Sequence, residues 1–322
     1  MNAFVAPTDR TWFDFLSEKA ARGEVDEVNF WLPKPWGGRF GVLSPGQPLL
    51  FKLKSPWNAV AGGGFFSHYT ELPISLAWQA FGPKNGAPSL MDVRDRIARL
   101  RRETPAPWED YTIGCILLAE PFFWPEEDWI PGPPGWKGQI VRGRTYDLTV
   151  EPGQTLWSQV CDRLEGMRGV GIPPGEESPP PFPSQSELFG GMGAPTLTPR
   201  RIGQGIFSSI IRDAYGRACA ISGERALPAL DAAHIRPFEE VQGHSIRNGI
   251  LLRSDMHRLF DAGYLTITPK HRVEASGTMR DDFNDGDNYL RLHGTRVAVP
   301  EREELTPDPE MLRWHNENRF RG

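Results

Sequence analysis

The chain has 322 residues, of which 39% are hydrophobic and 24% are charged, and its formal net charge is −5. This length accommodates two domains that each bury a core, and both fractions are typical of a globular protein. The acidic balance argues against strong non-specific binding of nucleic acid, so any contact with phosphates needs a local basic face.

Two further features of the sequence bear on its compartment. No apolar run reaches the roughly 20 residues of a membrane helix, and the first residues, MNAFVAPTDRTWFDF, lack the basic-then-apolar order of a secretory signal. Cys115, Cys161 and Cys219 are far apart and odd in number, which is typical of reduced thiols. We therefore expect a cytoplasmic protein without membrane contact.

Residues 1–170 are expected to form mostly β structure with a few helices. Alternating or continuous apolar runs bounded by turn residues predict strands, and apolar residues at helical spacing predict helices. The predicted strands cover residues 49–54, 58–72 and 112–124, and the predicted helices cover residues 73–82 and 89–103. The run Gly62–Gly64 indicates a bulge or a close backbone approach. Together these elements predict a small barrel or a strongly curved sheet.

The segment GQPLLFKLKSPWNAVAGGGFF, residues 46–66, resembles the core of PUA-superfamily domains, a group that includes the modified-base readers of the EVE, YTH and SRA families. The resemblance implies a PUA-like β-barrel that reads DNA, with a pocket of rings for a flipped base. The alternative is that the rings form an ordinary core. The candidates for the pocket are Trp36, Trp57, Phe65 and Trp78, and those for a local basic face are Lys34, Arg39, Lys52 and Lys54.

Residues 171–199, GIPPGEESPPPFPSQSELFGGMGAPTLTP, contain no lysine or arginine and show no hydrophobic period. Dense proline, glycine and serine are typical of a linker. The sequence therefore predicts a reader domain over 1–170, a linker over 171–199 and a second domain over 200–322.

The second domain is expected to begin with a helix. Ile206, Ile210, Ile211 and Tyr215 lie on one side of that helix, which is predicted to end near Gly216. Short strands follow around His234 and in the apolar run after Asn248, and a helix is predicted over 254–262. Ser254 is its expected N-cap and Gly263 its expected stop. The predicted order is strand, loop, strand, helix.

Three polar features fall within these elements. His257 and Asp261 are four residues apart, which places both side chains on one face of the predicted helix, where they could bind a divalent metal or form a surface ion pair. Asn248 precedes Gly249 and is, taken alone, an ordinary turn residue. His234, in DAAHIRPFEE, is in isolation a buried structural histidine.

Taken together, His234, Asn248 and His257 resemble the ββα-metal motif of the HNH endonucleases. The similarity covers residues 203–270 and is closest to the HNH domains of bacterial putative restriction endonucleases, through CAISGE, AAHIRP and NGILLRSDMHRLFDAGYLTI. It implies hydrolysis of phosphodiester bonds in double-stranded DNA with one Mg²⁺ or Mn²⁺ ion per site. It also implies that His234 is the general base and that His257 and Asp261 are metal ligands. Asn248 matches the residue that fixes the loop and so orients the base or, in some relatives, helps bind the metal.

The sequence departs from many of these relatives at one ligand position. Ala233 stands where an aspartate or histidine ligand precedes the general base, and Asp231 could replace that ligand only with some shift. No pair of Cys-x-x-Cys motifs is present, so we expect no structural zinc. The candidates for contacts to DNA phosphates are Arg236, Arg247, Arg253 and Arg258. His244, between the motif strands, is a further candidate, whereas His315 is expected to pack the C-terminal helix.

These resemblances predict a modification-dependent restriction enzyme that acts in defence against phage or other foreign DNA. The alternatives are an HNH nuclease of a mobile-element or antiphage system that senses another ligand, and a catalytically inactive nucleic-acid-binding module. Residues 201–322 carry 17 basic and 18 acidic side chains, so we expect the first half to provide the targeting. A homodimer is plausible because each HNH site hydrolyses one strand.

Overall fold

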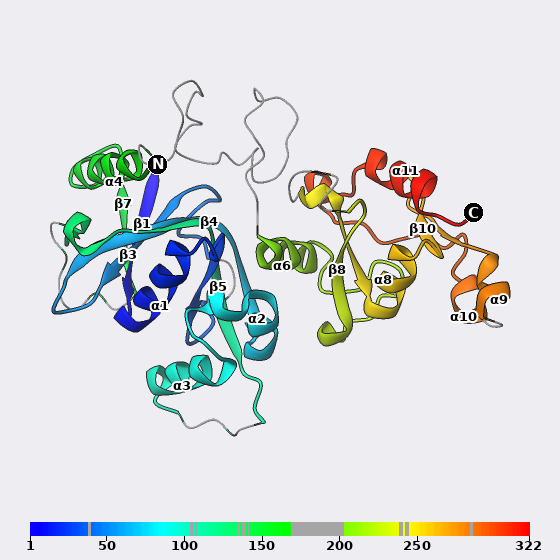
Figure 1. The fold of residues 1–322 in the computed structure, drawn as a ribbon, viewed down its shortest axis with the longest axis horizontal. Helices are drawn as coiled ribbons and strands as arrows, with labels where there is room; N and C mark the ends of the chain where they lie inside the picture. Colours follow the sequence, from blue (N-terminus) through cyan, green and yellow to red (C-terminus); the bar gives the residue numbers. More distant parts are fainter. Residues whose placement is uncertain are drawn as a thin grey trace. The chain divides into compact units, whose positions relative to one another are not determined.

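The computed structural model describes residues 1–37, 40–103, 106, 108–133, 136, 140, 142–168, 203–237, 241, 245–283 and 286–322. The chain divides into two compact units. The described part of the first unit ends at Arg168, and that of the second begins at Gly203 (Figure 1). The predicted linker, 171–199, and the predicted site residues Arg39 and His244 lie outside the described residues. Within the described ranges, no helix is long and apolar enough to cross a membrane.

The first unit is built on one mixed sheet of seven strands in the order β2-β5-β4-β3-β1-β7, with β6 also paired to β4. β1 runs parallel to β3, and the other pairs are antiparallel. The strands are β1 (Asn2–Thr8), β2 (Glu27–Leu32), β3 (Pro48–Leu53), β4 (Ala59–Pro73), β5 (Thr112–Phe123), β6 (Ile130–Pro131) and β7 (Arg144–Asp147).

This sheet corrects the expectation of a barrel. β2 and β7 end the strand order, and among the described strands they do not pair with each other, so the sheet stays open there. Its two faces are instead covered by helices. The mixed α+β class is confirmed, and the three predicted strands appear as β3, β4 and β5.

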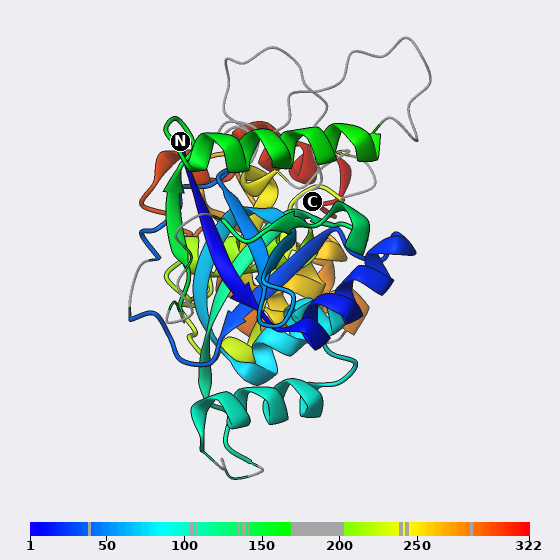
Figure 2. The ribbon, with the colours of Figure 1, turned by 90° about the vertical axis from the view of Figure 1, so that its left-hand side faces the viewer.

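Alternation of side chains gives the sheet a core on each face. Phe4 and Phe51 lie in one cluster with Trp12, Phe13 and Leu16 of α1. The neighbouring strand residues Val5 and Leu50 lie in the other cluster with Leu156 and Val160 of α4. Helix α4 is the long green helix in Figure 2. The helices of this unit are α1 (Arg10–Ala21), α2 (Ile74–Phe81), α3 (Leu90–Arg101) and α4 (Gly153–Arg168).

The second unit contains two small two-stranded sheets and several helices. Two antiparallel strand pairs, β8 with β9 and β10 with β11, alternate with helices along the chain. Helix α6 packs on β8 and β9, and α11 packs on β10. The elements are α6 (Gln204–Ala214), β8 (Leu230–His234), β9 (Gly249–Arg253), α8 (Ser254–Asp261), β10 (Leu265–Ile267), β11 (Val273–Ala275), α9 (Thr278–Phe283), α10 (Asp287–Leu290) and α11 (Pro309–Asn318).

Candidate functional site

His234 is the last residue of β8, where it pairs with Gly249 at the start of β9. Its ring stacks on Phe207 of α6, with 4.2 Å between ring centroids and 4° between ring planes. Helix α6 reaches the hairpin closely because Gly249 has no side chain, and a Cβ there would lie 2.8 Å from Cζ of Phe207. The stack holds the imidazole between the β8–β9 hairpin and α6.

Asn248 is fully buried and fixes the chain immediately after His234. The backbone N–H of Arg236 donates to its side-chain oxygen at 2.9 Å, and its side-chain nitrogen donates to the carbonyl of Arg236 at 2.8 Å. The N–H of Ile235 donates to the Asn248 carbonyl at 2.9 Å. A buried amide that satisfies both backbone groups of one residue holds that loop in one conformation.

His257 and Asp261 project from one face of α8, as their spacing predicts. The Nε2 atom of His257 lies 3.3 Å from Oδ2 of Asp261, and the Nδ1 atom lies 3.4 Å from Oδ2 of Asp231 on β8. The imidazole therefore lies between two carboxylates. The predicted stop at Gly263 is confirmed by its φ of +78°. The predicted N-cap is wrong, because Ser254 is the first helical residue and its hydroxyl donates to the Ala229 carbonyl.

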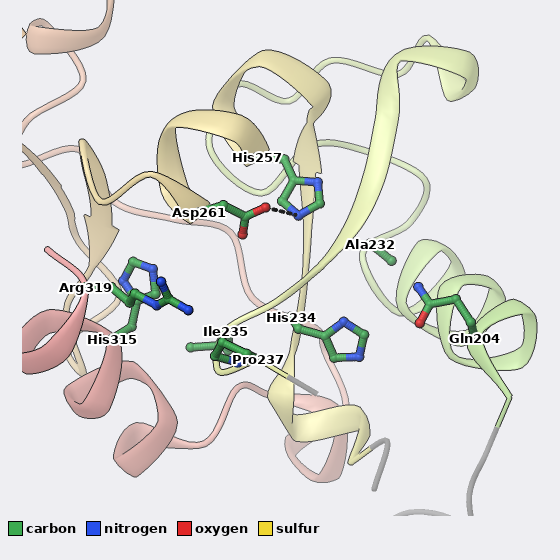
Figure 3. A pocket seen from close by; sticks show the side chains of 9 residues that line it. All are labelled: Gln204, Ala232, His234, Ile235, Pro237, His257, Asp261, His315 and Arg319. Carbon is green, nitrogen blue, oxygen red and sulfur yellow. Dashed lines mark ion pairs between the residues drawn. The ribbon is translucent and has the colours of Figure 1, made fainter. Parts of the chain in front are cut away.

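These side chains meet at a cavity of about 440 Å³ (Figure 3). His234, His257 and Asp261 line it, whereas Asp231 approaches His257 without lining the cavity. The sequence did not predict the rest of the wall, and two of its residues, His315 and Arg319, lie outside the motif-like stretch 203–270. The remaining lining residues are Gln204, Ala232, Ile235, Pro237, His315 and Arg319.

The titratable side chains of this wall respond to burial. Desolvation raises the pKa of the Asp261 carboxyl, and the nearby charges of His257 and Arg319 oppose that rise. Burial lowers the pKa of His315 to about 4. His315 is therefore neutral near pH 7, and its carbonyl partner, Phe260, requires the proton on Nε2.

The four arginines predicted to contact phosphate have other surroundings. Arg253 makes two hydrogen bonds of 2.6 Å to Asp255, which hold the pKa of that carboxyl well below its usual range. Arg247 donates to the Thr306 carbonyl at 3.3 Å. Arg236 lies 4.9 Å from the ring of Trp314, and Arg258 is exposed on α8. None of the four lines the cavity.

The four aromatic residues predicted for a base pocket are not gathered in one place. Phe65 is buried in the core cluster that includes α4, whereas Trp36 packs against the cluster on the other face of the sheet. Trp57 is 40% exposed, and the Arg10 guanidinium lies 4.8 Å from its ring. Trp78 is half-buried on α2.

The donor set at the cavity fits a hard divalent ion held by few protein ligands. In the part of the chain that the structure describes, no three His, Cys, Asp or Glu side chains gather as a metal cluster. The His257–Asp261 pair offers one imidazole and one carboxylate, 3.3 Å apart, on the cavity wall. A carboxylate favours Mg²⁺ or Mn²⁺, and Mg²⁺ usually keeps several waters.

Comparisons with known proteins agree with this geometry over one segment. No curated protein matches the chain. A crystal structure of ASCH from Zymomonas mobilis shares 13% identity at a TM-score of 0.31, over 48% of this chain and 94% of that one. The modification-dependent TagI restriction endonuclease shares 12% identity at a TM-score of 0.27, over 92% of this chain and 76% of that one. TM-scores of this size support no conclusion about fold or function.

The family models give the informative match. Residues 219–268 match the model of the HNH endonucleases, and this segment carries His234, Asn248, His257 and Asp261. Residues 219–268 are therefore similar to the HNH endonuclease family.

Proposed function

We propose that this protein is a metal-dependent DNA endonuclease whose second unit hydrolyses phosphodiester bonds. The observation that carries the proposal is the cavity at which His234, His257 and Asp261 meet inside the segment matched by the HNH family model. Hydrolysis of a phosphodiester needs a general base and a bound metal ion. His234 offers the imidazole of the base, and the His257–Asp261 pair offers the ligands for one ion.

In this proposal His234 is the general base. It takes a proton from the attacking water as the new P–O bond forms and the bond to the 3′ oxygen breaks. An imidazole suits this role because its ordinary pKa is close to neutral pH. The stack on Phe207 and the loop fixed by Asn248 keep the ring in place for that transfer.

His257 and Asp261 would hold a Mg²⁺ or Mn²⁺ ion at the cavity. A bound divalent ion supplies electrostatic stabilisation of the charge that develops on the phosphate and on the leaving oxygen. Asp231, predicted as a ligand, has a different role in this proposal. It accepts the Nδ1 proton of His257 across the 3.4 Å contact, so that the Nε2 lone pair faces the cavity.

We propose further that the first unit selects the DNA, in the manner of a PUA-like reader of modified bases, and that the enzyme restricts foreign DNA. The exposed Trp57, with Arg10 over its ring, supports an aromatic and cationic contact surface on this unit. Two copies of the chain would be needed for the simplest double-strand cut, since each site hydrolyses one strand.

The test compares His234→Asn with His271→Asn on supercoiled plasmid DNA in Mg²⁺ and in Mn²⁺. His271 is a matched control because it belongs to the same unit, does not line the cavity and has a φ of +55°, which asparagine tolerates. We expect His234→Asn to lower the nicking rate by about 10²-fold or more, and His271→Asn to leave it unchanged.

Plasmids with and without base modifications, used in the same assay, test the reader. Failure of the wild-type protein to nick any DNA with either ion would refute the nuclease. Equal nicking of all plasmids would retain the nuclease and remove the modified-base reader.

A further inference from the structure

Arg319, the residue that follows α11, brings a positive charge to the cavity from outside the matched HNH segment. It lines the cavity together with His234, His257 and Asp261, although it lies 51 residues beyond the end of that segment, residue 268. Figure 3 shows its guanidinium on the α11 side of this space. The side chain is exposed, so an incoming ligand can reach it.

The backbone around Arg319 is anchored to the end of α8, the helix that carries His257 and Asp261. The N–H of Arg321 donates to the Gly263 carbonyl at 2.9 Å. Gly263 lies so close to the Arg319 carbonyl that any Cβ there would overlap it. One turn earlier, His315 bonds the Phe260 carbonyl at 3.1 Å. These contacts fix the origin of the Arg319 side chain relative to the proposed metal ligands.

Among the described residues that line the cavity, Arg319 is the only arginine or lysine. Arg253 and Arg247, predicted from sequence as phosphate contacts, are engaged with Asp255 and Thr306 away from the cavity wall. A phosphodiester that enters the cavity therefore meets one guanidinium, and a guanidinium can donate two parallel hydrogen bonds to the oxygens of one phosphate.

We propose that Arg319 binds the non-bridging oxygens of the scissile phosphate, opposite the imidazole of His234. This inference rests on the proposed nuclease function and adds a substrate-binding residue from the C-terminal segment. The charge that builds up on the phosphate during attack is greater than in the ground state, so a fixed cation here favours the transition state. Cleavage is thus expected to depend on the last few residues of the chain.

The test compares Arg319→Gln and Arg319→Lys with Arg313→Gln in the full-length chain. Arg313 is a matched control because it is exposed on α11 and does not line the cavity. We expect Arg319→Gln to lower the rate of plasmid nicking in Mn²⁺ by on the order of 10²-fold. Arg319→Lys should retain part of the rate, since lysine keeps the charge and loses the bidentate geometry. Arg313→Gln should nick like the wild type.

A second measurement does not depend on cleavage. Binding of a fluorescein-labelled DNA duplex in EDTA is followed at several salt concentrations. The slope of log K against log salt should fall by about one in Arg319→Gln if one phosphate contact is lost. A thermal unfolding midpoint equal to that of the wild type would show that Arg319→Gln is folded.

Four outcomes separate the role of Arg319 from the proposed nuclease function. If the wild type nicks DNA and Arg319→Gln nicks equally well, the role of Arg319 is refuted and the nuclease stands. Equal losses in Arg319→Gln and Arg313→Gln would likewise refute it, because they indicate a general charge effect. If the wild type nicks no DNA, the proposed function fails, and an unchanged salt slope in Arg319→Gln would overturn the phosphate contact as well.

Discussion

His315 joins the C-terminal helix to the wall of the cavity through both ring nitrogens. Nδ1 lies 2.8 Å from the Thr266 hydroxyl, and Nε2 lies 3.1 Å from the Phe260 carbonyl. The ring also stacks on Phe260, with centroids 3.7 Å apart. Because the carbonyl can only accept a hydrogen bond, the histidine is neutral with its proton on Nε2, and the hydroxyl donates to Nδ1. A second proton would break this arrangement.

This arrangement predicts a pH-dependent stability. Burial lowers the pKa of His315 from 6.5 to about 4 in the folded chain, so between these pH values the unfolded chain binds the proton and the folded chain does not. The stability is fully present above about pH 6.5 and falls as the pH drops toward 4, by on the order of 3 kcal/mol. Urea unfolding of the wild type and of His315→Gln across this pH range measures the change in the free energy of unfolding.

The His315→Gln variant has no titrating group at this position. Its stability deficit relative to the wild type should therefore be largest near pH 7 and should shrink toward pH 4. A deficit that stays constant over the whole range would show that His315 is not the group responsible.

At the scale of elements, the glycine run of β4 allows three strands to approach closely. Gly62 pairs with Phe51 of β3 on one side and with Phe123 of β5 on the other. A Cβ built at Gly62 would overlap the Phe122 carbonyl, and one at Gly63 would lie 2.7 Å from the Leu49 carbonyl. The close approach expected from the sequence is therefore present, and the β4–β5 register shifts beside it, between Gly63 and Phe65.

Gly62→Ala should destabilise the first unit. The added methyl group meets backbone atoms, which cannot move aside as a side chain can, so we expect a loss of about 2–3 kcal/mol in the free energy of unfolding. Gly41→Ala is the matched control, because a Cβ at Gly41 has no atom within 4 Å. Thermal unfolding of both variants checks this, and equal midpoints would contradict the packing argument.

The β8–β9 hairpin and helix α8 show which part of the site can be predicted from the sequence. His234, Asn248, His257 and Asp261 lie within 28 residues, where strand pairing and helical spacing determine their positions. Arg319 reaches the same cavity only through tertiary packing of the C-terminal segment, which no local spacing encodes.

The open sheet and the scattered aromatic residues both follow from strand pairing and register, which local sequence patterns do not determine. β1 inserts between β3 and β7, and the sequence pattern predicts neither β1 nor β7. Phe65 and Phe66 are adjacent and therefore point to opposite faces, into separate cores. An aromatic cluster in sequence is thus not a pocket in space, because the side on which each ring lies depends on strand register.

At the scale of the whole molecule, the two units have different tasks in our proposal. Residues 201–322 carry 17 basic and 18 acidic side chains, so the second unit has almost no net charge with which to attract DNA. Binding of DNA by such a unit depends on a few local contacts such as Arg319 and is expected to be weak. The first unit would then supply both affinity and choice of DNA.

This division predicts the behaviour of a fragment that spans residues 203–322. The fragment retains the whole wall of the cavity, so its nicking rate at saturating protein should stay within about tenfold of the full chain, a difference of about 1.4 kcal/mol in the barrier. The protein concentration for half-maximal nicking should rise, and any preference between modified and unmodified plasmids should disappear. Circular dichroism establishes that the fragment is folded. A fragment that keeps the full chain's preference would place base selection in the second unit, because the first unit would then be absent while the discrimination remained.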